Sequence, residues 1–240
     1  QDVTTQWGVF ALAGPKSRDL LKRVINDPEP QNALSNNRFP WLSAKQIELG
    51  MCPVNAIRVA YTGELGWELH HPIEMQNYLW DLLLKEGEEF GLQLVGARAQ
   101  NWLRQEKSYR AFGNELGRDA TPAEADLPRF IDLSKEFNGK AAMEKTGIRT
   151  KCITVLIDGP VDADPWGREA IILDGKKVGR LTSGGYSVHF EKQIGMGYVL
   201  PTLAAVGQRL KVRMLGKLWD AEVVKDSPYD PTNKAILIDG

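Results

Sequence analysis

The feature that most restricts the fold of this chain is a change in sequence pattern after Gly147. From there to the C-terminus, short runs rich in β-branched and aromatic residues are separated by Asp-Gly, Gly-Gly and Leu-Gly-Lys turns. Short strands at such close spacing are typical of a small β-barrel or a β-sandwich. We expect six strands, over residues 152–157, 170–173, 177–182, 194–199, 209–215 and 218–224.

The part of the chain before this change mixes strand and helix patterns. An apolar run over residues 7–12 predicts a strand, and Pro15 suits the first position of the helix that follows it. Residues 55–61 alternate with period two, and residues 67–70 resume the pattern after a Thr-Gly-Glu-Leu-Gly turn. These two segments therefore predict a β-hairpin.

Helical spacing returns over residues 73–90 and again over residues 97–109. Helices and strands thus share the first part of the chain, whereas strands alone fill the second. The sequence predicts an α+β protein with one domain over residues 1–147 and a β-rich domain over residues 148–240.

Charge and hydropathy argue against two kinds of partner. The 30 Lys and Arg residues are interspersed with 31 Asp and Glu residues, which is unlike the basic footprint of a nucleic-acid-binding protein. No apolar run approaches the roughly 20 residues that a membrane helix needs. No Gly-x-Gly-x-x-Gly follows a strand and no P-loop pattern is present, so the chain shows no dinucleotide or nucleoside-triphosphate site of its own.

Cysteine and histidine are too few and too scattered to suggest a metal site. Cys52 and Cys152 lack Cys-x-x-Cys spacing, and His70, His71 and His189 lack the spacing of a zinc site. We expect two free thiols in a reducing compartment, hence a cytoplasmic protein, or one of the mitochondrial matrix in a eukaryote. No base lies near either cysteine in sequence, so neither is a candidate nucleophile.

The first candidate for chemistry is the hairpin. It places Tyr61 and Glu68 on its two arms, close to the turn. A carboxylate accepts two parallel N–H bonds from a planar donor edge, such as that of a pterin ring, and such bidentate pairs are strong and orienting. Tyr61 could stack on the same ring. Spacing alone favours a simpler hypothesis, in which Glu64 and Glu68 are solvated surface residues.

Two further segments carry candidate binding groups. Arg98 could hold a ligand carboxylate such as a glutamate tail. Arg104 and Glu106 could instead be paired charges on a helix or link the helix to the hairpin, and a structural role is favoured for Arg104. In the segment 182–187, two glycines permit close backbone approach and could form an anion-binding nest, although a plain hairpin is favoured. A histidine at 70–71 could move a proton near a reacting amine, although exposed strand-end histidines are favoured.

The order of several segments resembles the glycine-cleavage T-protein (aminomethyltransferase) superfamily. Two details, Lys107-Ser108-Tyr109-Arg110 and Gly184-Gly185-Tyr186-Ser187, look closer to its dimethylglycine and sarcosine dehydrogenase branch. The resemblance covers nearly the whole chain. Its matching segments are residues 12–16, 61–68, 103–106, 112–116, 121–124, 164–169, 178–184 and 194–199.

The resemblance implies a T-protein-like folate-binding domain, incomplete at its N-terminus, followed by a small six-stranded β-barrel. It also implies a tetrahydrofolate site in which Glu68 binds the pterin and Tyr61 lies against the folate. Arg98 has the family's Gly-Ala-Arg setting, but a strict register places Gln100 at that position. The functional hypothesis depends on a buried carboxylate at position 68.

The family has a long segment before the point at which this chain starts. That segment carries the Asp thought to assist transfer to folate, so the catalytic residue is unknown and expected outside this chain. In the dehydrogenase branch a FAD domain lies further upstream. We therefore expect a fragment or a subunit, whose missing N-terminal half or FAD subunit is a partner.

The resemblance implies transfer of a methylene group to tetrahydrofolate from an aminomethyl or iminium intermediate. The donor would be an N-methyl amine such as dimethylglycine or sarcosine, or glycine. Two alternatives stay open, namely a non-catalytic folate-binding scaffold and a folate-dependent O- or S-demethylase. Fold alone does not separate them.

Overall fold

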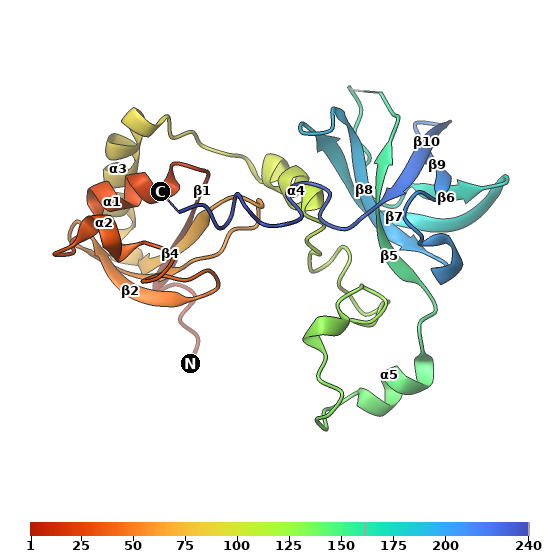
Figure 1. The fold of residues 1–240 in the computed structure, drawn as a ribbon, viewed down its shortest axis with the longest axis horizontal. Coiled ribbons are helices and arrows are strands. Elements are labelled where there is room, and N and C mark those ends of the chain that lie inside the picture. Colours follow the sequence, from red (N-terminus) through yellow and green to blue (C-terminus); the bar gives the residue numbers. More distant parts are fainter. Residues whose placement is uncertain (161, 240) are drawn as a thin grey trace. The chain divides into compact units, whose positions relative to one another are not determined.

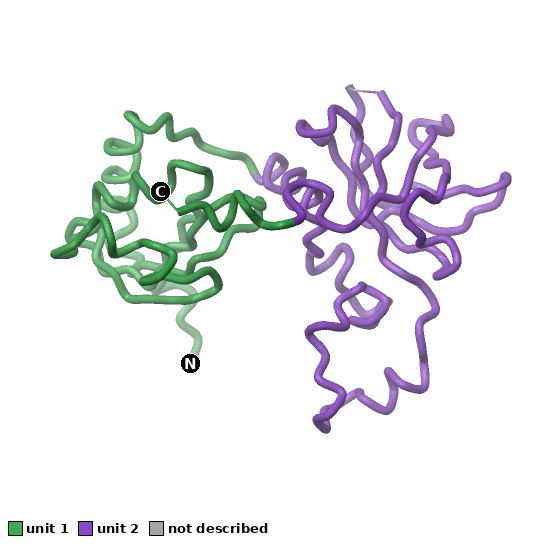
Figure 2. The backbone as a smooth tube through the Cα atoms, in the orientation of Figure 1, with its two compact units in different colours: residues 1–96, 232–240 green, residues 97–231 purple. Residues whose placement is uncertain are grey.

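A computed structural model describes residues 1–160 and 162–239 (Figure 1). The chain forms two compact units, one from residues 1–96 with 232–240 and the other from residues 97–231 (Figure 2). The boundary between the two compact units thus lies at residue 97. The change in sequence pattern at residue 148 lies inside the second unit, at the start of its strands.

The first unit is an antiparallel four-stranded sheet with helices. The strand order is β1-β4-β3-β2. The predicted strand over residues 7–12 is confirmed. The helix predicted after Pro15 and the helix predicted within residues 73–90 are confirmed as well. The elements are β1 (Trp7–Ala13), α1 (Ser17–Val24), α2 (Pro30–Ala33), β2 (Ala44–Leu49), β3 (Cys52–Ile57), β4 (Gly66–Pro72) and α3 (Gln76–Gly87), with 3-10 turns at Ile73–Met75 and Glu88–Phe90.

The antiparallel pairing of β3 with β4 confirms the predicted β-hairpin, but its first strand is shorter than the predicted residues 55–61. Ile57 pairs with Glu68 and is the last residue of β3. Arg58 follows outside the strand. Its side chain lies on the core side, as that of Ala56 does, and donates to the Phe39 carbonyl oxygen at 2.7 Å and to that of Ile236 at 3.3 Å. The expectation that Tyr61 lies on a strand is therefore wrong.

The core of the first unit lies on one face of the sheet. Trp67 and Leu69 on β4 are fully buried, and α1 and α3 pack on the same side. Residues between them on the strand point to the other face, because successive side chains of a strand alternate. On that face Val9 of β1 remains 50% exposed and Trp7 39% exposed.

Residues near the C-terminus belong to the first unit. Ile236 is 3% exposed, and the buried guanidinium of Arg18 donates to the carbonyl oxygen of Ile238 at 2.5 Å and pairs with Asp239 at 3.4 Å. Asn36 donates to the Leu237 carbonyl oxygen at 2.9 Å. This tail segment, residues 236–239, is thus a structural part of the unit.

The second unit contains a closed β-barrel, which confirms the six predicted strands and decides between barrel and sandwich. The order around the barrel is β10-β5-β8-β7-β6-β9. The helices of this unit are α4 (Ala97–Glu106), which packs on β7, and α5 (Lys140–Thr146). The strands are β5 (Lys151–Ile157), β6 (Ala170–Leu173), β7 (Lys176–Ser187), β8 (Lys192–Val199), β9 (Arg209–Met214) and β10 (Lys217–Val224).

The barrel interior is filled by aliphatic side chains, among them the fully buried Val155, Leu181 and Val212. Both cysteines are buried and unpaired, which confirms the two free thiols. Burial raises the pKa of the Cys152 thiol to about 12, so this residue is a poor nucleophile near neutral pH. Within the described part of the chain, no helix has the length and apolar character needed to cross a membrane.

Candidate functional site

The open face of the first sheet carries the strongest candidate residues. The strand register places Ala11, Glu68 and Ile57 side by side across β1, β4 and β3. The next row on the same face contains Val9, His70, Asn55 and Gln46. A carboxylate and an imidazole therefore lie on a sheet face that is partly apolar.

Glu68 is half-buried rather than buried. Its side chain is 43% exposed, and its Oε2 atom lies 3.2 Å from Nε2 of His70, whose side chain is 31% exposed. The expectation of a buried carboxylate is wrong, because Glu68 lies on the sheet face opposite α1 and α3. Its position still allows it to accept charge-assisted hydrogen bonds from a planar donor that lies on the sheet.

The two adjacent histidines have different environments. His71 is fully buried on the helical side of the sheet, with Nδ1 2.9 Å from the Leu69 carbonyl oxygen and its ring 4.7 Å from that of Phe10. The expectation of two exposed strand-end histidines is thus wrong for His71, because neighbouring strand residues face opposite sides. Of the two, His70 is the one beside the carboxylate.

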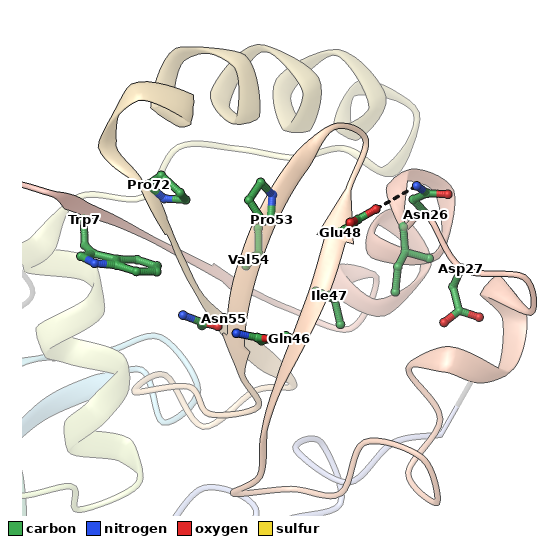
Figure 3. A pocket seen from close by; sticks show the side chains of 11 residues that line it. Trp7, Asn26, Asp27, Gln46, Ile47, Glu48, Pro53, Val54, Asn55 and Pro72 are labelled. Atoms are coloured by element: carbon green, nitrogen blue, oxygen red, sulfur yellow. Dashed lines mark hydrogen bonds between the residues drawn. The ribbon is translucent and has the colours of Figure 1, made fainter.

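A hollow of about 400 Å³ lies further along the same sheet face (Figure 3). Apolar and polar side chains line it about equally. Its charged lining residues, Asp27 and Glu48, are both acidic, and none of the described lining residues is basic. Glu48 accepts a hydrogen bond from Asn26 at 3.0 Å. Glu68 is not among the described residues that line it, which are Trp7, Ile25, Asn26, Asp27, Gln46, Ile47, Glu48, Pro53, Val54, Asn55 and Pro72.

Tyr61 lies in the loop that connects β3 to β4 and is 39% exposed. The loop reverses at Gly63, whose φ of +83° favours glycine. Leu65 and Trp67 then anchor the return of the chain in the core. The structure thus places Tyr61 and Glu68 in one unit, on either side of this reversal.

Arg98 belongs to the second unit, near the start of α4. Its Nη2 atom donates to Asp164 at 2.6 Å, and its guanidinium lies 5.5 Å from the Trp102 ring and 5.8 Å from the Trp166 ring. The Arg98 side chain is 62% exposed. A ligand carboxylate could therefore approach it from solvent, but in competition with Asp164.

Arg104 is structural, as the sequence favoured, but its partner is Glu115 rather than Glu106. The two charges lie 2.8 Å apart, with side-chain exposures of 1% and 0%. Ser183 on β7 and Thr182 also donate to the Glu115 carboxylate, at 2.5 and 2.7 Å. Residues two apart on a helix do not face each other, which is why Arg104 and Glu106 are not a pair.

Glu106 instead accepts a hydrogen bond from Ser187 and another from the His189 backbone N–H at 3.2 Å. Gly184 and Gly185 belong to the β7–β8 hairpin. The sequence favoured such a hairpin over an anion-binding nest. A Cβ atom on Gly185 would lie 2.2 Å from Cδ1 of Trp102, so glycine here permits the close approach of α4.

Thr121 and Glu124 form a reciprocal cap at the turn predicted there. The Thr121 backbone N–H donates to the Glu124 carboxylate at 2.8 Å, and the Glu124 N–H donates to the Thr121 hydroxyl at 3.2 Å. Hydrogen bonding from Arg149, with that from Thr121, lowers the pKa of Glu124 from 4.5 to about 2. Glu124 itself is fully buried.

This depressed pKa predicts an acid-sensitive contribution to stability. The ionised Glu124 carboxylate, with its hydrogen bonds from Arg149 and Thr121, contributes fully to folding stability well above pH 4.5. This contribution is lost as the pH falls towards the pKa of about 2 in the folded protein. We expect Glu124→Gln to reduce the stability difference between pH 6 and pH 3 by about 1–2 kcal/mol, since Arg149 is half exposed and its charge is screened. Urea unfolding of both proteins at the two pH values measures this, and equal pH dependence would contradict it.

Comparisons with known proteins give the following matches. The family model described as "GCVT N-terminal domain" matches residues 1–135, and "Glycine cleavage T-protein C-terminal barrel domain" matches residues 150–230. Human mitochondrial dimethylglycine dehydrogenase is 38% identical over 233 residues, which cover 94% of this chain and 26% of the dehydrogenase. The chain thus spans about a quarter of that relative's length.

Shorter relatives are covered to a larger extent. An aminomethyltransferase of Caldanaerobacter subterraneus is 30% identical over 239 residues, which cover 98% of this chain and 62% of that protein. Among solved structures, the glycine cleavage system aminomethyltransferase T of Bartonella henselae matches with a TM-score of 0.78 at 22% identity, over 93% of this chain and 60% of that one. At that identity the structural match shows the shared fold.

Proposed function

Because the chain belongs to the glycine cleavage T-protein family, we propose that it is a tetrahydrofolate-binding module for one-carbon transfer. Its substrate would be an aminomethyl or iminium intermediate derived from an N-methyl amine such as dimethylglycine or sarcosine, or from glycine. The names of its relatives, dimethylglycine dehydrogenase and aminomethyltransferase, support this choice of donor.

The observation that carries the proposal is the position of Glu68. Its carboxylate is accessible and has apolar cross-strand neighbours in Ala11 and Ile57. The amino-pyrimidine edge of a pterin offers two parallel N–H groups, and a carboxylate is the acceptor that matches them in a bidentate pair. The apolar neighbours Ala11 and Ile57 suit contact with the ring plane, so the residues present fit the group.

Bound tetrahydrofolate would supply the nitrogen that accepts the one-carbon unit. The task of the protein's own residues is positioning, because holding two reactants together makes their reaction effectively intramolecular. Glu68 would orient the pterin, and Tyr61 would lie against the folate. Arg98, which belongs to the second unit, would hold a ligand carboxylate in exchange for part of its contact with Asp164.

The remaining chemistry of the longer relatives is proposed to lie outside these residues. The Asp that assists transfer would come from a part of the family domain that these residues do not match, and FAD would belong to another domain or to a partner subunit. One mammalian relative is mitochondrial by name, which supports a mitochondrial matrix location if the source is eukaryotic, and the cytoplasm otherwise.

Titration of the 240-residue chain with tetrahydrofolate tests the proposal. We expect Glu68→Ala to weaken binding on the order of 30-fold, or about 2 kcal/mol, because a charge-assisted pair is lost. Glu48→Ala is the matched control, since it removes another carboxylate from the same sheet face and should leave affinity unchanged. Absence of binding by the unmodified chain, or equal binding by Glu68→Ala, would refute the folate site.

A single-turnover assay on the full-length gene product separates transfer from scaffolding. Formation of methylene-tetrahydrofolate from an N-methyl amine, once FAD of another domain or of a partner subunit has oxidised the amine by two electrons to the iminium, supports the transferase. Folate binding without transfer would support the scaffold alternative instead. Transfer from an O- or S-methyl donor would support the demethylase.

A further inference from the structure

Glu68 needs a second group to hold its carboxylate in one orientation. Glutamate has several rotatable bonds, and long polar side chains lose much rotamer freedom when they are fixed. The cross-strand neighbours of Glu68 are Ala11 and Ile57, whose side chains cannot form hydrogen bonds. A fixing contact must therefore come from elsewhere on the same face.

His70 provides that contact. It lies two residues further along β4, so its side chain emerges on the same face as Glu68. Its Nε2 atom is 3.2 Å from Oε2 of Glu68. The residues opposite His70 on the two neighbouring strands are Val9 and Asn55, neither of which carries a charge.

The imidazole also has limited freedom of its own. Its side chain is 31% exposed, and Val9 and Asn55 flank it across β1 and β3. A proton on Nε2 makes this nitrogen a donor to Glu68, whether or not Nδ1 is also protonated. The hydrogen bond occupies one oxygen of the carboxylate from the side and leaves its remaining lone pairs available to a ligand.

We propose that His70 is a positioning residue that fixes the Glu68 carboxylate for ligand binding. This inference rests on the proposed folate site at Glu68. His70 acts through the carboxylate and makes no contact with the folate itself. Removal of the imidazole therefore lowers the affinity for folate only through the loss of a fixed Glu68 orientation.

Substitutions at His70 test this with binding as the readout. Tetrahydrofolate is titrated into the 240-residue chain carrying His70→Ala or His70→Gln. We expect His70→Ala to raise Kd about tenfold and His70→Gln to restore it to within about threefold, because the glutamine amide places an N–H donor near the position of Nε2. Gln46→Ala, in the same cross-strand row, is the control and should not change Kd. Thermal unfolding of each variant shows whether the fold is kept.

A double-mutant cycle with Glu68→Ala decides whether His70 acts through the carboxylate. In the Glu68→Ala background, His70→Ala should have no further effect on Kd. An equal loss in both backgrounds would overturn the inference, because His70 would then contact the ligand directly. Unchanged binding by His70→Ala, with Glu68→Ala weakened, would also overturn it while leaving the folate site intact. Absence of binding by the unmodified chain would overturn both proposals.

Discussion

Replacing Arg104 with alanine is expected to lower the free energy of unfolding of the second unit by about 3–5 kcal/mol. The guanidinium and the Glu115 carboxylate form a pair at 2.8 Å with side-chain exposures of 1% and 0%. Removal of the cation leaves an uncompensated charge in the interior. It also removes donors to the Tyr109 carbonyl oxygen at 2.7 Å and to Ser183 at 2.5 Å, so several buried acceptors lose a partner together.

Urea unfolding followed by circular dichroism measures this effect. Arg180→Ala is the matched control, because Arg180 pairs with Asp119 at 3.2 Å on the surface of the same unit, with side-chain exposures of 50% and 86%. Exposed pairs contribute about 0–1 kcal/mol, so this variant should unfold almost as the unmodified protein does. Similar losses in the two variants would show that the buried pair has no special role.

Removal of residues 236–240 is expected to destabilise the first unit by about 3–5 kcal/mol, through loss of a buried aliphatic side chain and of buried hydrogen-bond partners. Burial lowers the pKa of both Arg18 and Arg58, which shows that these cations lie in a poorly solvated environment. The tail supplies carbonyl oxygens from Ile236 and Ile238 to them. Without the tail, two buried guanidinium groups lose acceptors and Ile236 no longer fills the core.

Trp67 reports on this change, because the Arg58 guanidinium lies 5.6 Å from its ring and its side chain is fully buried. We expect the truncated protein to show a red-shifted tryptophan emission and a lower denaturation midpoint. The control is Ile238→Ala, since that side chain is 44% exposed and only its backbone contacts Arg18. An unchanged midpoint after truncation would show that the tail is dispensable.

Local patterns in the sequence were sufficient to predict the six strands of the second unit, because turns separate them, but they left barrel and sandwich open. β7 also extends to Ser187, beyond its predicted end at residue 182. Local patterns were insufficient for β2, whose sequence Ala-Lys-Gln-Ile-Glu-Leu is half polar and has no strict apolar alternation. β2 is an edge strand, and most of its side chains remain exposed, so burial imposes little apolar alternation on it. The length of β3 was overestimated because residues 58–61 continue the period-two pattern although the strand ends at Ile57.

The same distinction applies to the candidate site. Period two on β4 places Glu68 and His70 on one face, so their proximity follows from the sequence once the strand is recognised. The exposure of Glu68 does not follow, because it depends on which face the helices cover. The pairing of Arg104 with Glu115 was also missed, since Glu115 lies in a loop and no sequence period links the two. A lone Glu in an otherwise apolar and glycine-rich loop segment was the available signal.

The tail segment affects the order in which the protein can be made. The ribosome makes residues 1–96 before the barrel strands, yet the structure formed by these residues also includes Ile236 and its neighbours, which are made after those strands. The barrel, in contrast, is encoded by one uninterrupted stretch and has all of its strands once β10 has emerged. During translation the barrel is therefore able to form before the first unit is complete, because that unit awaits residues 236–239.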